Sequence, residues 1–376
     1  MGEALSSARA AIGEREPDLT LLFASPEHPL QDVLAAANGK VPGTVVGCST
    51  AGEIGDTDMQ TGGIAAFMVS WGDAQHRAEP LVQLDPEGER PATALTASHA
   101  SLFASARIAG QNAGISLVFG DGLHPGLERL VTKMRQRLPL HHAVVGGGAG
   151  DGGALERTFV GLDGTVASTA ATAVHVASST PWGVGVGHGA EPIGERMTVT
   201  RATGNVVHEL DGRPTVQVYR DFADRRAIPL DDADDMKRLL IEYELGIHFF
   251  EDLARIRAGI AALPDGSVAC AGEVPEGATV SFVHGEPEQY IAAAEEAARS
   301  AEEGLDGAEA AGVLLISCIT RGMVIGDRYA EEVAAVRRVF GDIPLGGFLS
   351  YGEIARVRGK LDAVHNNSLV VVAIPR

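Results

Sequence analysis

The sequence predicts an α/β protein of two domains with mixed sheets, built from internally duplicated units of strand, helix, strand and glycine loop. Short apolar runs alternate with helical segments, which is the pattern of α/β units. Glycine is also abundant, at 47 of 376 residues, and gathers just after the apolar runs. Such clusters occur where the backbone turns tightly or approaches another group closely. A chain of this length can form two domains of ordinary size.

One pattern occurs three times along the chain. The first copy has a strand, a helix, a second strand and a glycine loop at 19–25, 29–37, 44–46 and 47–54. The third copy has the same segments at 312–318, 328–340, 343–345 and 347–354. Both loops begin with glycine and end in Gly-Glu-Ile at the same spacing. This agreement predicts that the two segments fold alike.

The second copy is looser, because its glycine loop is one residue shorter. Its segments lie at 115–119, 126–137, 143–145 and 146–151, and it ends in Asp151. A further apolar run follows each acid, at 64–70, 172–178 and 368–374. These extra strands have no helices between them and their neighbours, so we expect mixed sheets and not purely parallel ones.

The middle of the chain differs in pattern from the three copies. Strands are expected at 197–203, 206–210 and 216–219, and again at 267–270 and 279–284. The charged, helix-forming stretch at 231–243 suggests a linker, and a long helix is expected from Pro287 to about Glu303. We place the domain boundary within 215–230, which gives domains at 18–215 and 216–376.

Composition excludes several classes of function. The chain has 30 Lys and Arg against 50 Asp and Glu, a net charge of −20, which argues against nucleic-acid binding. It shows neither a membrane span nor a secretory signal, so a cytoplasmic protein is expected. The cysteines Cys48, Cys270 and Cys318 lack metal-ligand spacing, which predicts no structural metal.

Two motifs resemble the sequence patterns of known sites but lack features that those sites require. Gly148, Gly150 and Gly153 fit the dinucleotide fingerprint, but no helix start follows and Asp151 would repel a pyrophosphate. The loop at 47–52 has the form GxSxxG, whereas the nucleophile elbow of hydrolases is GxSxG. Neither motif therefore supports an enzyme of its class.

The thiols and histidines leave alternatives open. Cys318 precedes Arg321 by three residues, so it is either an activated thiolate or a small buried hydrophobe. An acyl-transfer enzyme would use Cys48 or Cys318. His175 is expected in the core, and the pair at 141–142 on the surface. The spacing of the histidines neither excludes nor supports haem.

The repeated acids Glu53 and Glu353 have two interpretations. Each carboxylate could accept hydrogen bonds from its own loop and fix the turn. Alternatively, it could hold the ammonium of a ligand whose anionic group is bound by glycine-loop amides. The second arrangement would suit amino acids and similar zwitterions. It is open whether the loop at 146–151 belongs to the same site.

Several segments resemble one protein family. VVGCSTAGEI at 45–54 resembles the FIST N-terminal domain, and VVHELDGRPTVQVY at 206–219 the junction that follows it. LLISCITRG at 314–322, PLGGFLSYGEI at 344–354 and NNSL at 366–369 are similar to the FIST C-terminal domain. The resemblance covers nearly the whole chain in the same order.

The resemblance implies a non-enzymatic sensory protein of signal transduction that binds a small ligand such as an amino acid. No output domain is recognised, so the signal would pass to a separate protein, such as a histidine kinase. One branch of the family resembles haem proteins that sense nitric oxide and regulate a histidine kinase, but no histidine is carried over from it. The cofactor therefore stays unknown, with haem as the alternative.

The resemblance and the glycine loops together give a set of candidate ligand-binding residues. Ser49 and Thr50 would bind a ligand carboxylate, Glu53 or Glu353 its ammonium, and Arg321 an anion by a bidentate contact. The full set is Ser49, Thr50, Gly52, Glu53, Cys318, Arg321, Gly347, Ser350, Tyr351, Gly352 and Glu353.

Overall fold

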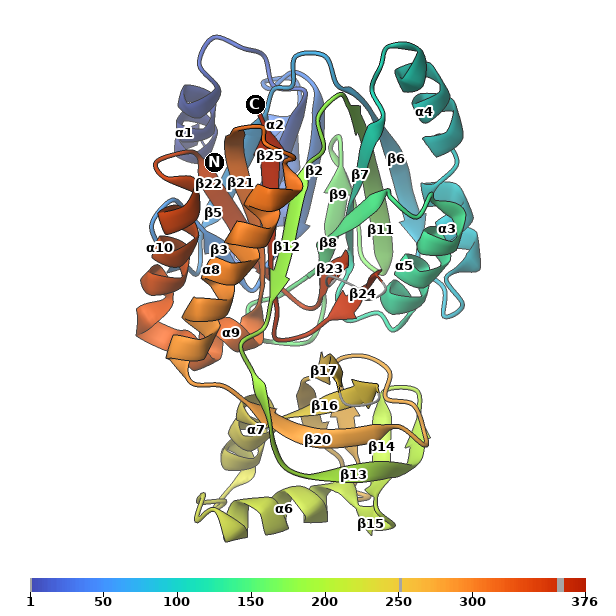
Figure 1. The fold of residues 1–376 in the computed structure, drawn as a ribbon, viewed down its shortest axis with the longest axis vertical. Coiled ribbons are helices and arrows are strands. Elements are labelled where there is room, and N and C mark those ends of the chain that lie inside the picture. The colour runs from blue at the N-terminus through green and yellow to red at the C-terminus, as the bar shows by residue number, and fades with distance from the viewer. Residues whose placement is uncertain (1, 250–251, 357–361) are drawn as a thin grey trace.

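The computed structural model describes residues 2–249, 252–356 and 362–376. The chain forms a body of three sheets with flanking helices, and a smaller lobe below it (Figure 1). The lobe runs from β13 to β20, and the body comprises the segments before and after it. The predicted class, α/β with mixed sheets, is confirmed.

Each sheet of the body is built around the same four elements. A central strand pairs in parallel with the strand that follows its helix, and antiparallel with a later strand. In the first sheet these are β1 (Leu19–Ala24), α2 (Leu30–Ala37), β2 (Thr44–Ser49) and β5 (Ile64–Val69). In the second they are β7 (Ala113–Asp121), α5 (Gly126–Arg137), β8 (Ala143–Ala149) and β11 (Ala170–Ser178). In the third they are β21 (Ala310–Cys318), α10 (Tyr329–Phe340), β22 (Leu345–Ser350) and β25 (Leu369–Pro375).

The three sheets exchange strands in a closed cycle. The strand after each glycine loop leaves its own sheet and pairs with the next: β3 (Gly52–Ile54) with β22, β23 (Glu353–Arg356) with β8, and β9 (Val160–Leu162) with β2. Further strands of the body are β4 (Met59–Gln60), β6 (Gln75–Gln83), β10 (Thr165–Ala167), β12 (Gly183–Gly187) and β24 (Asp362–His365). The strands β3, β9 and β23 therefore hold the three sheets together.

Apolar side chains from all three sheets meet in the centre of the body. Phe23 of β1 stacks on Phe348 of β22 at 4.6 Å between ring centroids, and Phe119 of β7 lies 6.3 Å from Phe23. All three are at most 1% exposed. Burying a phenylalanine contributes roughly 1.5–3 kcal/mol, so this shared core favours one folded body over three independent units.

Helices cover the outer faces of the sheets. Besides α2, α5 and α10, these are α1 (Gly2–Ile12), α3 (Glu89–Leu95), α4 (His99–Ile108) and α8 (Pro287–Gly304). The helix α9 (Ile319–Ile325), with a 3-10 turn at Gly326–Arg328, lies at the lower end of the body. The predicted helix from Pro287 is confirmed as α8. No helix among the described residues is long and apolar enough to cross a membrane.

The lobe is an antiparallel sheet packed on two helices. Its strands are β13 (Glu191–Thr203), β14 (Val206–Leu210), β15 (Arg213–Pro214), β16 (Glu244–Phe249), β17 (Asp252–Arg257), β18 (Gly259–Ala262), β19 (Val268–Cys270) and β20 (Thr279–His284). Its helices are α6 (Thr215–Arg225) and α7 (Ala233–Glu242).

Two predictions for this region are wrong. Residues 216–219 form part of α6 and not a strand, because the buried residues Val218, Tyr219 and Phe222 follow helical spacing. The stretch at 231–243 is not a linker, because α7 places Met236 and Leu239 in the core of the lobe.

The expectation for His142 is also wrong, because this side chain is buried and only 2% exposed. Its Nε2 lies 2.7 Å from the hydroxyl of Ser116, which also bonds Nδ1 of His175 at 2.7 Å. Burial lowers the pKa of His142 to about 2, so it packs as a neutral ring. The prediction that His175 lies in the core is confirmed.

Candidate functional site

A cavity of about 490 Å³ lies where the body meets the lobe. The body contributes the loops after β7, β8 and β22 and the helix that directly follows β21, and the lobe contributes α7, β18 and the segment after β19. Ligand sites in α/β sheets form at the carboxyl ends of strands, where these segments of the body lie. We call this space the interlobe cavity.

The walls of the interlobe cavity are largely apolar. Leu127 and Val364 line it from the body, and Ile241 and Ile260 from the lobe. Met323, which also lines it, is 49% exposed. An exposed apolar residue beside a hollow of this size suits a ligand with an apolar body.

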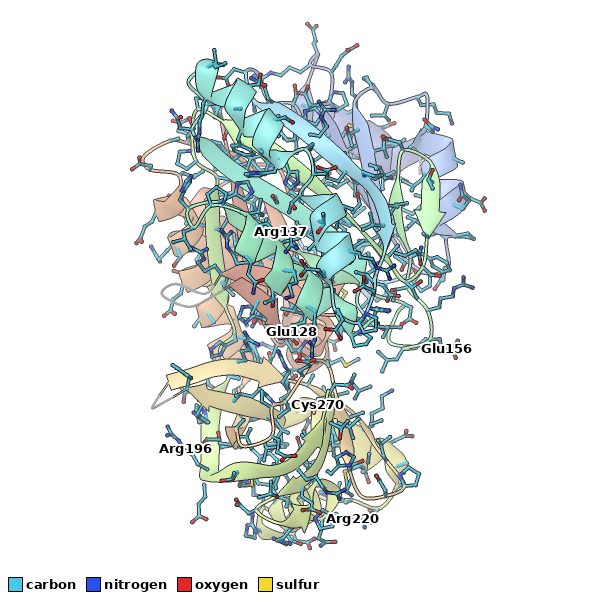
Figure 2. All side chains as sticks on the ribbon, turned by 90° about the vertical axis from the view of Figure 1, so that its right-hand side faces the viewer. Glu128, Arg137, Glu156, Arg196, Arg220 and Cys270 are labelled. Carbon is cyan, nitrogen blue, oxygen red and sulfur yellow. The ribbon has the colours of Figure 1, made fainter. Side chains whose placement is uncertain are left out.

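Glu128 provides the main charged group of the cavity and links the two parts of the chain. It lies in the first turn of α5, where the helix dipole stabilises an anion. Its Oε1 accepts hydrogen bonds from Arg257 at 2.6 Å and Arg255 at 2.9 Å, both on β17 of the lobe. Figure 2 shows Glu128 at the lower end of the body, with Cys270 in the lobe beneath it.

Arg257 holds both sides of this junction. Its side chain is fully buried and donates to the carbonyl oxygens of Val364 in the body, at 3.2 Å, and Glu273 in the lobe, at 3.1 Å. Burial lowers the pKa of Arg257, and the charge of Glu128 opposes that shift. A buried guanidinium with these partners links the lobe to the body, since removing one partner would strand a charge.

Further polar groups are placed along the cavity. Glu273 lines it and forms an ion pair with Arg129 at 2.7 Å, while exposed Lys237 lines it from α7. His124 accepts the Gly126 amide at Nδ1, at 3.0 Å, so in the neutral ring Nε2 carries the proton and can donate. The cavity thus combines carboxylates with hydrogen-bond donors.

Of the predicted site residues, three line the interlobe cavity: Cys318, Tyr351 and Gly352. The Tyr351 hydroxyl donates to Asp151 at 2.6 Å and accepts the Gly153 amide at 2.7 Å. Burial opposes ionisation of Asp151, but hydrogen bonds from Tyr351 and the amides of residues 155–157 lower its pKa overall. Asp151 therefore fixes the loop after β8. Gly153, in the same loop, lines the cavity.

Glu53 and Glu353 have equivalent hydrogen bonds, each from one hydroxyl of its own loop and one amide further along the chain. Glu53 accepts from the Thr50 hydroxyl and from the Gly63 amide at 2.9 Å. Glu353 accepts from the Ser350 hydroxyl at 2.6 Å and from the Ser368 amide at 3.2 Å. Burial raises the pKa of both, to about 8 for Glu353. These bonds match the loop-fixing interpretation of the repeated acids.

The remaining predicted residues lie inside the protein. The Ser49 hydroxyl accepts the Phe159 amide at 2.9 Å, and Gly52 and Gly347 are paired within β3 and β22. Arg321 is fully buried in an ion pair with Glu332. It also donates to the carbonyls of His188 at 2.6 Å and Tyr290 at 3.0 Å.

The cysteines are poorly suited to nucleophilic chemistry. Cys48, Cys270 and Cys318 are all buried. Burial raises the pKa of Cys318 well above its usual value, and the nearby acids Glu353 and Glu244 raise it further. Burial likewise raises the pKa of Cys48. Both thiols are therefore protonated at neutral pH, whereas the thiolate is the nucleophile.

The residues of the interlobe cavity do not fit haem. Its one lining histidine, His124, could serve as an axial ligand through Nε2 only in a different tautomer. Its lining residues include one lysine, Lys237, and no arginine, so a single basic side chain would face the two propionates.

Comparison with known proteins gives two family matches along the chain. The FIST N domain model matches residues 18–213, and the FIST C domain model matches residues 216–356. The chain belongs to the FIST family. FIST domains are ligand-binding sensory domains of signalling proteins.

Several FIST relatives have no described activity. An uncharacterised protein of Mycobacterium tuberculosis is 29% identical over 96% of this chain and 92% of its own length. Another, from Mycobacterium bovis, is 31% identical over 48% of this chain and 47% of its own. A protein of Methanocaldococcus jannaschii is 33% identical over 23% of this chain and 17% of its own length.

Sequence reasoning missed the charged residues of the cavity. Glu128 lies far in the sequence from the two arginines that it binds. Arg255 follows it by 127 residues and Arg257 by 129. The one local signal was the alternation in Arg255-Ile256-Arg257, which places two arginines on the same face of a strand. A pair of arginines on one strand face indicates an acidic partner without identifying it.

Proposed function

We propose that this FIST protein is a non-enzymatic sensor that binds an amino acid with an apolar side chain, or a similar small metabolite, in the interlobe cavity. The observation that carries the proposal is a cavity lined from both the body and the lobe, with a cross-lobe ion cluster beside it. A ligand there contacts both parts and shifts their relative orientation toward the arrangement it fits best.

The charges of the cavity support a zwitterionic ligand. Oε2 of Glu128 accepts the Glu273 amide, at 3.3 Å, and a carboxylate oxygen can accept a second donor such as a ligand ammonium. Lys237 and His124 offer donors to the ligand carboxylate. The apolar side chain would lie against Leu127 and Ile260.

The signal would pass to a separate signalling protein, and a histidine kinase is the class that we propose. A partner that contacts both body and lobe could read a change in their relative orientation. Cys318, Tyr351 and Gly352 remain our proposed ligand contacts from the original set, since they line the interlobe cavity.

A cavity-filling substitution tests the proposal. We expect the unfolding midpoint of the protein to rise with one or more apolar amino acids, because a ligand at 100 times its Kd stabilises by about 2.7 kcal/mol. Ala271 lines the cavity, so Ala271→Phe should abolish this shift. Ala104→Phe, on the exposed face of α4, should leave it unchanged.

A second pair of variants tests the role of charge. Glu128→Gln should weaken binding of the amino acid, whereas Glu295→Gln should not. Glu295 is a matched control because it also pairs with two arginines, Arg299 and Arg338, but lies on α8. If no amino acid shifts the midpoint, or if Ala271→Phe retains the full shift, the interlobe cavity is not the sensory site.

A further inference from the structure

The N-terminal helix α1 lies on the body, far from the lobe (Figure 1). Two further hollows border this helix. An open groove of about 640 Å³ runs between α1 and α2, and a smaller space of about 260 Å³ lies between α1, β5 and β22. Ala4, Ser7, Gln60 and Ile64 line both spaces. The two hollows thus flank α1 as one site, which we call the α1 site.

The side chains on the underside of α1 are too small to fill the space beneath the helix. The helix presents Ala4, Ser7, Ala8 and Ala11 to the smaller hollow. Ala8 is the one buried residue of α1, at 8% exposure. A helix of 11 residues is marginal in water by itself, so α1 depends on contacts that this underside supplies only sparsely.

A buried carboxylate reaches this site from below. Glu53 lines the smaller hollow, is 4% exposed, and has its Oε2 next to Gly63, which also lines the space. Two hydrogen bonds, from Thr50 and Gly63, leave further acceptor capacity on its oxygens. Among the described residues, Glu53 forms no ion pair with a lysine or arginine.

The charges around Glu53 leave its negative charge largely uncompensated. Burial raises its pKa, and Glu27 adds repulsion, while His28 and the two hydrogen bonds act in the opposite direction. The lining residues of the α1 site include the acids Glu3, Asp32 and Asp56, and neither lysine nor arginine. A buried carboxylate in such surroundings favours a cationic ligand.

The other walls of the α1 site are apolar and open. Phe67 and Ile64 face the smaller hollow from β5, and Phe23 closes its inner end. Gly63 and Gly346 line the same space and contribute no side chains that would fill it. An aliphatic or aromatic group can lie here, with its cationic end toward Glu53 and, where geometry allows, against a ring face.

We propose that the α1 site binds a small primary amine, with its ammonium on Glu53 and its apolar body beneath α1 against Ile64 and Phe67. The bound amine supplies the contacts that the underside of α1 lacks, so occupancy orders α1 on the body. This site is separate from the interlobe cavity, and the proposal does not rest on the function proposed for that cavity.

Thermal unfolding and limited proteolysis of the full chain test this proposal. The probes are n-butylamine and 2-phenylethylamine, with butyrate and 3-phenylpropionate as matched anions. We expect an amine to raise the unfolding midpoint and to slow tryptic cleavage after Arg9 in α1, while the anions have no effect. Failure of both amines to do either would overturn the proposal.

Three variants assign the binding to the α1 site. Glu53→Gln should weaken amine binding roughly tenfold or more, because it replaces a charge-assisted hydrogen bond by a neutral one. Ala4→Leu should fill the hollow and block binding while leaving Glu53 intact, which keeps the test valid if Glu53→Gln fails to fold. Glu295→Gln, which removes a carboxylate charge on α8 outside both hollows, should bind amines normally. Amine binding that survives Ala4→Leu, or that Glu295→Gln weakens as much as Glu53→Gln does, would refute the α1 site.

Discussion

At the scale of single residues, the ion pair of Arg321 with Glu332 places two charges in the interior of the protein. Both side chains are 0% exposed, so neither charge is solvated by water. Two backbone carbonyls complete the hydrogen bonds of the guanidinium. Such a pair contributes little net stability when intact, but removing one partner leaves the other charge buried. The neighbouring Cys318 faces a cavity, whereas Arg321 does not, so these two neighbours in sequence have different roles.

Arg321→Ala should therefore lower the free energy of unfolding by about 3–5 kcal/mol, the usual cost of stranding a buried charge. The sequence resemblance favoured a ligand contact, which predicts weaker binding with unchanged stability. Urea denaturation with an apolar amino acid present and absent distinguishes the two outcomes. Arg338→Ala is the control, because its exposed pair with Glu295 is worth about 0–1 kcal/mol. Unchanged stability of Arg321→Ala with lost affinity would restore the ligand role.

At the scale of elements, β12 and α8 lie so close together that the positions of β12 facing the helix have no room for a side chain larger than that of glycine. A Cβ on Gly183, Gly185 or Gly187 would lie 1.7, 1.8 or 2.4 Å from a carbonyl oxygen of α8. These alternate glycines therefore form the surface on which the helix rests. No strand was predicted at GVGVG, and its helix partner begins 100 residues after β12 ends, so the pairing could not be identified from spacing.

Gly185→Ala should push α8 away from β12 and destabilise the protein by about 1–3 kcal/mol, since overpacking against backbone cannot be relieved by a rotamer change. Thermal or urea unfolding measures this loss. Gly72→Ala offers a comparison, because a Cβ there would meet nothing within 4 Å, and its effect should stay within about 0.5 kcal/mol. Equal stability of the two variants would show that the helix adjusts freely.

At the scale of the whole molecule, local patterns predicted the units but not how they interlock. The apolar runs and glycine loops marked β1, β2, β21 and β22, since each pattern lies within a few residues. The exchange of β3, β9 and β23 between sheets depends on pairings between distant segments, which no local spacing encodes. The same distinction separates the site residues that could be predicted from those that could not. Tyr351 was found through its local motif, whereas the charged residues at the interlobe cavity come from distant segments and meet only on folding.

This interlocking bears on the proposed domains at 18–215 and 216–376, which meet close to the boundary of the two family matches. Separated there, the first segment loses the partners of β3 and β12, and the second loses that of β23. Unpaired strand edges promote association. Each segment expressed alone should therefore aggregate or lack cooperative unfolding, and co-expression should restore a complex that unfolds in one transition with the midpoint of the intact chain. Calorimetry and size-exclusion chromatography measure both properties. Two segments that each unfold cooperatively as monomers would show that strand exchange is dispensable, and that the sequence boundary is also a folding boundary.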